Sequence, residues 1–387
     1  MEISITSDFQ TFLRPICVTT GGHPTPEQLE NASRLMEFDR NHVAYSDGKV
    51  VGAAGAFSHK LAVPGGIVRA AAVHSVAVLP THRRKGILSQ LEQVQLSDIF
   101  RRGEAVAYLW PSEEAIYGRF GYGIACHRTW ITMDPKEVRL TNLPEQRGTV
   151  TLVDAKNAYD VIAPIYNRVW QTRPGMFFRT EEWWRLRRFA DPNLFYAVWE
   201  DSAYALYRIE LNTSTGYLAG ELEVVEAVAE SAEGERQIWR YLLAIDLIKT
   251  IRVFSLPVDH PLILMLEEPR KLNMQLGQSL WVRIVDVEAA LRARASGEGS
   301  IVIRVTDDPL LPHNAGIWRV CNEGIERVAM APQLTVDIAA LGSVYLAGFT
   351  FAELARAGRI TEELPGGIRQ ADRVFSWDRK PWCPEQF

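Results

Sequence analysis

The sequence predicts a mixed α/β (α+β) protein that contains more than one domain. A chain of 387 residues is too long for one ordinary hydrophobic core, so two or three domains are expected. Its 47% hydrophobic and 23% charged residues are typical of a soluble globular protein. Apolar, β-like runs alternate with helix-like segments along the chain, and this order favours central sheets covered by helices.

The first 140 residues carry the signals of one sheet with helical cover. Residues 26–36 have helical composition and begin at Pro26. Turn residues at 46–48 and 64–66 indicate two hairpins, and a second helix continues to Gln95. The expected strands are 43–45, 49–57, 59–63, 67–72, 75–79, 105–110 and 123–133. Proline and polar residues at 135–148 mark a domain boundary.

The middle region, 141–288, repeats the order strand, turn, helix. Its expected elements are strands at 194–199, 203–208 and 221–228 and a helix at 235–248. The turn before this helix carries three carboxylates, Glu230, Glu233 and Glu235, which would repel a pyrophosphate. We therefore expect a structural or acceptor-facing role for this region.

The last region, 289–387, has the composition of a small α+β domain. A helix at 287–294 introduces it. Strand-like segments follow at 300–305, 316–321 and 324–331, then apolar runs at 335–341 and 345–348 and a helix at 350–357.

The most informative segment is the strand, turn and helix that span Ser75–Leu88. Three cations and Gly86 open the helix, where unpaired backbone N–H groups and the helix dipole favour an anion. Gly86 has no Cβ, so a ligand can approach the backbone closely. The segment therefore predicts a pyrophosphate site, although a solvated basic helix start would have the same composition.

Two motifs in this region resemble those of a known enzyme family. Arg83-x-x-Gly86-x-Leu88 is similar to the R/Q-x-x-G-x-G/A loop of GNAT acetyltransferases, with Leu88 in place of the usual small residue. Ile116-Tyr117-x-x-x-Gly121-Tyr122 is similar to their F-Y-x-x-x-G-F element. Together with an aromatic last residue, these segments resemble the Eis (enhanced intracellular survival) family of GNAT N-acetyltransferases.

The resemblance implies tandem GNAT-like acetyltransferase folds followed by a sterol-carrier-protein-like α+β domain. Residues 1–140 would form the acetyl-CoA-binding GNAT domain, 141–288 a degenerate GNAT-like domain, and 289–387 the sterol-carrier-like domain. The implied activity is acetyl transfer from acetyl-CoA to a primary amine of an aminoglycoside, a polyamine or a lysine-like acceptor, directly within a ternary complex. The alternative is an acyl-CoA- or lipid-binding protein without turnover. The family also suggests a homo-oligomer, a trimer-based hexamer.

Acetyl-CoA would be held by two backbone segments and a few side chains. The N–H groups of 84–88 would bind the pyrophosphate, with charge from nearby guanidinium groups. The strand backbone would pair with pantetheine, although its two valines also suit a sheet core. Ser112 matches a family position beside the cofactor, or caps a helix. The candidate cofactor-binding residues are Val76, Ala77, Val78, Arg83, Arg84, Lys85, Gly86, Ile87, Leu88 and Ser112.

Tyr117 is the candidate acid for the leaving group, because a phenol with a pKa of about 10 can protonate a thiolate whose pKa is about 8.5. We expect Tyr122 to pack instead. The resemblance assigns the amine side of the site to the terminal carboxylate of Phe387. A carboxylate with a pKa of roughly 3.5 is a weak base in water, so its role would be positioning as much as proton removal. Further candidate bases are Glu113, Glu114 and a bound water.

The residue before Phe387 is Gln386, where the best-known family member has an acid, and Glu385 is a possible substitute one position earlier. His82 suits the turn or a position beside the phosphates, and His74 and His127 suit structural positions. A covalent acetyl-cysteine is not expected, since Cys126 lies on a predicted strand and the other cysteines are far from the motifs.

Composition excludes several other classes of function. The net charge of −5 argues against general nucleic-acid binding, and the local cations at 82–85 suit a small polyanion. Four scattered cysteines favour a reducing cytoplasm, and their spacing implies no metal site. We expect no signal peptide, because the start lacks a cationic region followed by an apolar one, and no membrane span, because the chain lacks an apolar stretch of about 18 residues.

Overall fold

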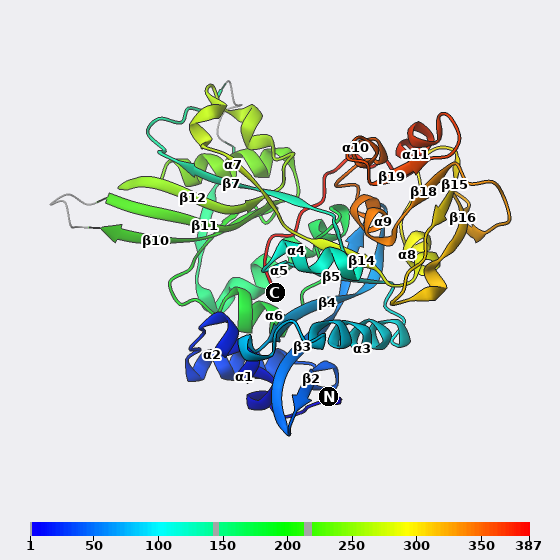
Figure 1. The fold of residues 1–387 in the computed structure, drawn as a ribbon. Coiled ribbons are helices and arrows are strands. Elements are labelled where there is room, and N and C mark those ends of the chain that lie inside the picture. The colour runs from blue at the N-terminus through cyan, green and yellow to red at the C-terminus, as the bar shows by residue number, and fades with distance from the viewer. Residues whose placement is uncertain (1, 142–146, 213–218) are drawn as a thin grey trace. The chain divides into compact units, whose positions relative to one another are not determined.

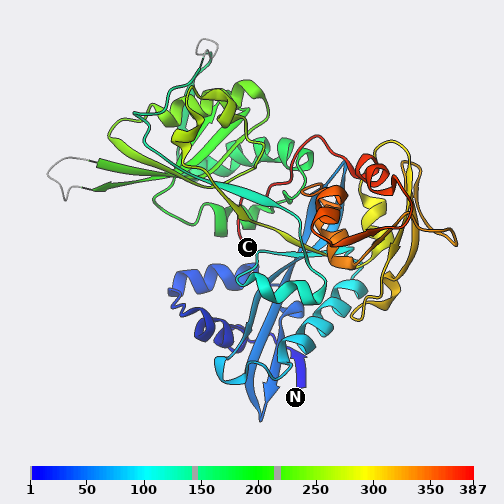
Figure 2. The same cartoon turned by 45° about the horizontal axis from the view of Figure 1, so that its top comes forward.

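The computed structural model describes residues 2–141, 147–212 and 219–387, and the chain divides into two compact units. The first unit comprises Met1–Cys126, Ser279–Pro381 and Gln386–Phe387, and the second comprises His127–Gln278 and Trp382–Glu385. Three β-sheets with flanking helices can be traced through the described residues (Figure 1, and turned by 45° in Figure 2). None of the helices in these residues is long and apolar enough to cross a membrane.

The main sheet of the first unit has strand order β1-β2-β3-β4-β5-β14-β6. Its strands are β1 Glu2–Ile5, β2 His42–Ser46, β3 Lys49–Val63, β4 Gly66–Val78, β5 Val106–Leu109, β14 Trp281–Ile284 and β6 Gly123–Ile124. The predicted hairpins are confirmed, but 49–57 and 59–63 form one strand, as do 67–72 and 75–78. Strand β3 continues through Ser58 and Lys60, whose side chains are exposed, and β4 continues through a β-bulge near Ser75, whose φ is +55°.

The helices of this unit are α1 Phe9–Thr20, α2 Pro26–Leu35, α3 Ile87–Arg101 and the short α4 Glu114–Tyr117. The predicted helix at 26–36 is confirmed as α2, with a capping box from Thr25 and Pro26 at its first position. Helix α1 was not predicted, because Pro15 lies inside it. The residues that flank it are nevertheless typical of helix ends: the Asp8 side chain caps its start, and Gly21 after its end adopts a left-handed conformation.

The second unit contains a sheet of strand order β13-β7-β12-β11-β10-β9-β8. Its strands are β13 Gln275–Gln278, β7 His127–Met133, β12 Ile248–Leu256, β11 Ala219–Ala229, β10 Ala203–Asn212, β9 Phe195–Trp199 and β8 Val150–Val153. Its helices are α5 Ala158–Val169, α6 Glu181–Trp183 and α7 Ala232–Leu243, and residues Trp184–Arg188 form a π-helix. The three predicted strands are confirmed as β9, β10 and β11. The predicted helix is confirmed as α7, but it ends at Leu243, and Ile248, the last residue of the predicted span, begins β12.

The single strand predicted at 123–133 is wrong, because this segment contributes to both sheets. Residues Gly123–Ile124 form β6 in the first, and His127–Met133 form β7 in the second. Between them, the N–H groups of Ala125 and Cys126 both donate to the carbonyl of Leu280, at 2.9 and 3.1 Å. Strand β14, which follows Leu280, lies between β5 and β6. The domain limits expected at residues 140 and 288 stay predictions.

The C-terminal region forms the five-stranded sheet β17-β16-β15-β18-β19. Its strands are β15 Ser300–Val305, β16 Gly316–Cys321, β17 Gly324–Arg327, β18 Leu334–Val336 and β19 Ile360–Glu362, and its helices are α8 Val287–Ala293, α9 Ile338–Tyr345, α10 Phe351–Arg356 and α11 Gly367–Phe375. Helix α9 is buried throughout and packs on β6 and β14. A Cβ at Gly123 would lie 1.9 Å from the Ala339 oxygen, and one at Gly342 would lie 2.3 Å from the Val282 oxygen. Only glycine permits this approach.

The chain ends in an ordered segment. Within the second unit, the Trp382 N–H donates to the Pro174 carbonyl at 2.8 Å, and its indole N–H donates to Ser255 at 3.0 Å. The Ser255 hydroxyl in turn donates to the carbonyl of Cys383 at 3.2 Å. The last two residues, Gln386 and Phe387, belong to the first unit.

Candidate active site

The turn between β4 and α3 presents backbone N–H groups and cations together. Arg84 and Gly86 both adopt left-handed φ, at +63° and +79°, and Gly86 is the N-cap of α3. No side chain caps this helix, and its first backbone bond runs from Gln90 N to Gly86 O at 3.2 Å. The amides of 87–89 thus lie in the first turn, where helix geometry supplies no acceptor. The turn has the chemistry of an anion site.

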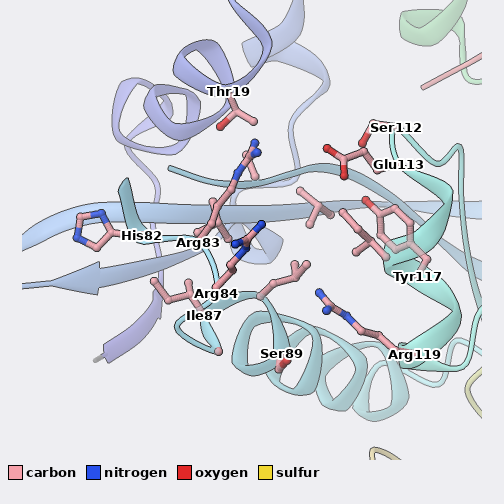
Figure 3. A pocket seen from close by; sticks show the side chains of 16 residues that line it. Thr19, His82, Arg83, Arg84, Ile87, Ser89, Ser112, Glu113, Tyr117 and Arg119 are labelled. Atoms are coloured by element: carbon pink, nitrogen blue, oxygen red, sulfur yellow. The ribbon is translucent and has the colours of Figure 1, made fainter. Parts of the chain in front are cut away.

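A cavity of about 530 Å³ opens over this turn. It brings together most of the residues predicted from the sequence: Val76, Ala77, Val78, Arg83, Arg84, Gly86, Ile87, Leu88, Ser112 and Tyr117. Lys85 is exposed and is not among the lining residues. Figure 3 shows the arginines of the turn on one side of the cavity and Tyr117, Ser112 and Glu113 on the other.

One edge of β4 faces the cavity without a strand partner among the described residues. The parallel pairing of β4 with β5 covers only Ala70–Ala72 and Val106–Tyr108. Beyond the bulge at Ser75, the backbone of 76–78 remains joined to β3 on its other side, as in the pairs Ala77–Ala53 and Val78–Gly52. The extended backbone of 76–78 can therefore bond an amide-bearing chain as an added strand.

Tyr117 ends α4 and is 5% exposed. Burial raises the pKa of its phenol, and the charge of Glu92 raises it further, while a hydrogen bond with Ser112 acts in the opposite direction. Tyr117 is therefore a neutral proton donor at physiological pH. Tyr122 is buried beside it, with ring centroids 5.7 Å apart at 73°, and does not line the cavity.

Several lining residues were not assigned to the donor site from the sequence. These are Thr19, Ser89, Glu113, Ile116 and Arg119, while His82, for which a position beside the phosphates was one of two expectations, also lines the cavity. Arg119 lies in the same motif as Tyr117, and its guanidinium, 4.8 Å from the ring of Phe120, adds a third arginine to the cavity (Figure 3). Thr19 could not be assigned, because its helix α1 was itself not predicted.

The terminal residue, Phe387, is not among the residues that line this cavity but lies at the place where β4 and β5 separate. Its ring centroid is 4.9 Å from that of Tyr108 and 5.8 Å from that of His59. Tyr108 is the last residue of β5 that pairs with β4, and its hydroxyl lies 2.5 Å from Nδ1 of His59.

The alternative role of Glu385 is not supported, because its carboxylate is buried in ion pairs of the second unit. Its Oε2 lies 3.1 Å from Arg179 Nη2 and 2.7 Å from Arg188 Nε. The indole N–H of Trp183 also donates to this carboxylate.

The remaining candidates take structural positions. His74 is buried and stacks on Phe57 at 4.0 Å, and Cys126 is buried with its thiol donating to the Pro381 carbonyl at 3.1 Å. In the part of the chain that the structure describes, no group of three or more histidines, cysteines or carboxylates could hold a metal ion.

The comparisons with known proteins agree with this architecture. Residues 4–125 and 175–284 each match a family model described as an acetyltransferase (GNAT) domain. Residues 287–384 match a sterol carrier protein domain. The protein is therefore an N-acetyltransferase of the GNAT class with two GNAT domains and a sterol carrier domain, and acetyl-CoA is the donor that these domains imply.

Relatives identify the family within this class. An N-acetyltransferase of Streptomyces avermitilis is 34% identical over 379 residues, covering 93% of this chain and 92% of its own. N-acetyltransferase Eis of Mycobacterium bovis is 32% identical over 351 residues, covering 85% and 84%. The crystal structure of Eis1 from Mycobacterium abscessus superposes with a TM-score of 0.90 at 35% identity, covering 100% of both chains. The chain belongs to the Eis family of N-acetyltransferases.

Proposed function

We propose that the first unit transfers the acetyl group of acetyl-CoA to a primary amine by direct attack within a ternary complex. The observation that carries this proposal is the single cavity shared by the uncapped start of α3, the open edge of β4 and Tyr117. These three features match, in order, a pyrophosphate, an amide-bearing arm and a thioester that must release a thiolate.

Each group has a defined task in this mechanism. Arg83, Arg84 and the amides of 87–89 neutralise the phosphates, and the backbone of 76–78 holds the pantetheine arm. The amine nitrogen bonds to the acetyl carbon and loses one proton to solvent, and the carbon–sulfur bond then breaks. The departing sulfur takes the phenol proton of Tyr117, which burial keeps protonated until this step.

We assign the acceptor side to the chain end. The ring of Phe387 rests on Tyr108, at the point where the two central strands part. A terminal carboxylate at this place would attract an ammonium acceptor and orient it toward the thioester. Acceptors of this kind include polyamines, aminoglycosides and lysine side chains.

The direct test is release of free thiol from acetyl-CoA in the presence of these three classes of amine. Amine-dependent release with matching formation of acetyl-amine supports the proposal. Binding of acetyl-CoA without release with any amine would instead indicate an acyl-CoA-binding protein. Initial rates that give intersecting double-reciprocal lines support a ternary complex, whereas parallel lines indicate an acetyl-enzyme.

Removal of Phe387, or a C-terminal tag, should abolish most turnover while leaving acetyl-CoA affinity and Tm nearly unchanged. Deletion removes the ring and moves the carboxylate by one residue, and a tag replaces it with a neutral amide. The N-terminally tagged protein is the control. Equal kcat for the two tagged forms would contradict the role of the carboxylate and leave Glu113, Glu114 or water as the base.

A further inference from the structure

The C-terminal segment Trp382–Glu385 is buried within the second unit, although it forms neither a helix nor a strand. A chain end of this kind usually frays unless specific contacts hold it. A Cβ at Gly175, whose φ is +91°, would lie 2.9 Å from the Trp382 oxygen, so glycine permits the close approach of the segment. The bonds to Pro174 and Ser255 described above add to this contact. The second unit therefore encloses the C-terminal segment.

Glu385 carries the charge that joins this segment to the second unit. Its two arginine partners, Arg179 and Arg188, also bind Glu226. Arg179 donates to both Glu226 oxygens, at 2.9 and 2.6 Å, and Arg188 donates to one of them at 3.0 Å. Arg179 and Glu226 are 2% exposed and Glu385 is 5% exposed, so two cations are matched by two carboxylates away from water. Loss of the Glu385 charge would leave a buried cation without a counter-charge, which is costly.

The C-terminal segment lies where the two central parallel strands of the second sheet part. Strands β11 and β12 pair up to Val224 and Val253. Beyond this pair, Glu226 on β11 is linked to the segment through its arginines, and Ser255 on β12 is bonded to it directly. In the first sheet, Phe387 lies where β4 and β5 part. Consecutive parts of the chain end thus lie at the strand separations of both GNAT domains.

We propose that the second GNAT domain binds the C-terminal segment through Glu385 and thereby fixes the terminal carboxylate at the acceptor side, an inference that rests on the proposed function. Only Gln386 separates Glu385 from Phe387, so the chain keeps the Cα atoms of these two residues within about 7 Å of each other. Glu385 is a positioning residue in this role and acts through Phe387. A misplacement of about 1 Å can cost about 10²-fold in rate, so release of Glu385 should slow acetyl transfer.

Glu385→Gln tests this role, because glutamine keeps the size of the side chain but removes its charge. The kcat/KM for the amine should fall roughly tenfold or more. The KM for acetyl-CoA should stay unchanged, since none of the described residues that line the donor cavity belongs to the C-terminal segment. Glu385→Asp keeps the charge and should restore most of the activity. Glu181→Gln is the matched control, because Glu181 pairs with Arg185 in the same unit but is exposed.

A double variant separates positioning from stability. Adding Arg188→Met to Glu385→Gln leaves Arg179 and Glu226 as a neutral, doubly bonded pair, so the Tm lost in the single variant should largely recover. The rate should not recover, because the C-terminal segment still lacks its ion pairs. Recovery of amine turnover together with Tm would show that Glu385 only neutralises the buried charge, and would overturn the proposal.

Carboxypeptidase digestion followed by mass spectrometry gives a readout independent of turnover. The parent protein should resist removal of Phe387, whereas Glu385→Gln should lose it several-fold faster. The double variant gives the same comparison if the single variant fails to fold. Equal rates of removal, or amine kinetics unchanged by Glu385→Gln in an active parent enzyme, would overturn the proposal. No thiol release by the parent enzyme with any amine would instead contradict the proposed function, and digestion would still decide whether Glu385 holds the chain end.

Discussion

The two GNAT domains use the same strand, turn and helix in opposite ways. In the first, β4 leads through Arg83 and Arg84 to Gly86, which starts α3 without a side-chain cap. In the second, β11 leads to Ser231, whose hydroxyl accepts from the Gly234 N–H at 3.1 Å and caps α7. The first helix start is left available to a ligand, whereas the second is satisfied by its own chain.

Two carboxylates of the second turn also bind side chains of their own domain. Glu233 accepts hydrogen bonds from Arg236 and Gln237, and Glu235 lies 2.8 Å from His260 and 2.9 Å from the indole nitrogen of Trp239. Along this turn, neutralised acids replace the cations that line the cavity of the first domain.

The strands that lead into these turns also differ: the edge of β11 is covered by side chains, whereas the edge of β4 is open. Beyond its last residue paired with β12, Val224, strand β11 carries Glu226, which lies 2.6 Å from Arg179 and 3.0 Å from Arg188. The same arginines bind Glu385, so the chain's own C-terminal segment occupies this part of the second domain. The corresponding edge of β4 faces a cavity. The strand edge and helix start are thus open in one copy of this fold and closed by the chain's own side chains in the other.

The largest expected effect comes from removing the phenol that we propose as the acid of the first domain. Tyr117→Phe should lower kcat by about 10² to 10⁴ and leave acetyl-CoA affinity nearly unchanged, because positioned acid catalysis contributes on that order. Steady-state kinetics with saturating amine measure the effect. Tyr122→Phe is the matched control, since its ring packs beside Tyr117 outside the cavity. A harmless Tyr117→Phe beside a damaging Tyr122→Phe would contradict the assignment.

One buried glutamate in each domain should make stability depend on pH, and the two dependences should have opposite signs. Burial raises the pKa of Glu92 on α3 from 4.5 to about 8, so the folded protein retains a proton that the unfolded chain loses. The contribution of this group to the free energy of unfolding falls as pH rises between these values, by on the order of 5 kcal/mol in all. Glu92→Gln should therefore raise Tm relative to the parent protein more at pH 9 than at pH 5.

Glu235 gives the contrasting case. Burial alone would raise its pKa, but the charge and hydrogen bond of His260 and the indole of Trp239 lower it. Its contribution to stability is present above the unfolded pKa of 4.5 and is lost as pH falls below that value. Glu235→Gln should destabilise at pH 7 and have little effect near pH 3. Equal pH dependence of the two glutamine variants would contradict these environments.

Charge reversal in the first turn tests what its cations do. Arg84→Glu should raise the KM for acetyl-CoA by about ten- to a hundredfold, since one charge-assisted phosphate contact is worth roughly 1.5–3 kcal/mol. Glu230→Lys, in the equivalent turn of the second domain, is the matched control and should leave this KM unchanged. Unaltered acetyl-CoA affinity in a folded Arg84→Glu variant would place the pyrophosphate elsewhere.

The sequence predicts those parts of the site whose residues lie together in short motifs. Arg83, Arg84 and Gly86 lie within four residues, and Tyr117 follows a strand at the start of a helical turn. Local chemistry indicated an anion site at the basic turn, and the resemblance to GNAT motifs implied that Tyr117 belongs to the same site. The hairpins and helix α2 were equally accessible, because turn residues and caps act over a few positions.

The remaining features depend on contacts between distant segments. Strand β14 enters the first sheet from residue 281, and nothing within 123–133 indicates that a strand from so far along the chain separates β5 from β6. Glu92 has the composition of an exposed helix position, and only the packing of α3 against the core cluster that contains Tyr117 and Tyr122 makes it buried. Long-range pairing and burial of a single polar group leave no local pattern to detect.

The smallest expected effect concerns the cap that closes the second helix start. Ser231→Ala removes the acceptor for the Gly234 N–H and should cost about 0.5–2 kcal/mol of stability, measured as a lower Tm. Because this helix start is closed by its own chain, KM for acetyl-CoA and kcat should stay unchanged.

Gly86→Ser is the converse variant. A Cβ at Gly86 meets nothing within 4 Å, but its φ of +79° disfavours a side chain. The serine hydroxyl would also compete with a ligand for the open amides. The variant should weaken acetyl-CoA binding more than it lowers Tm. If Ser231→Ala weakened acetyl-CoA binding as strongly as Gly86→Ser, both helix starts would have to be treated as ligand sites.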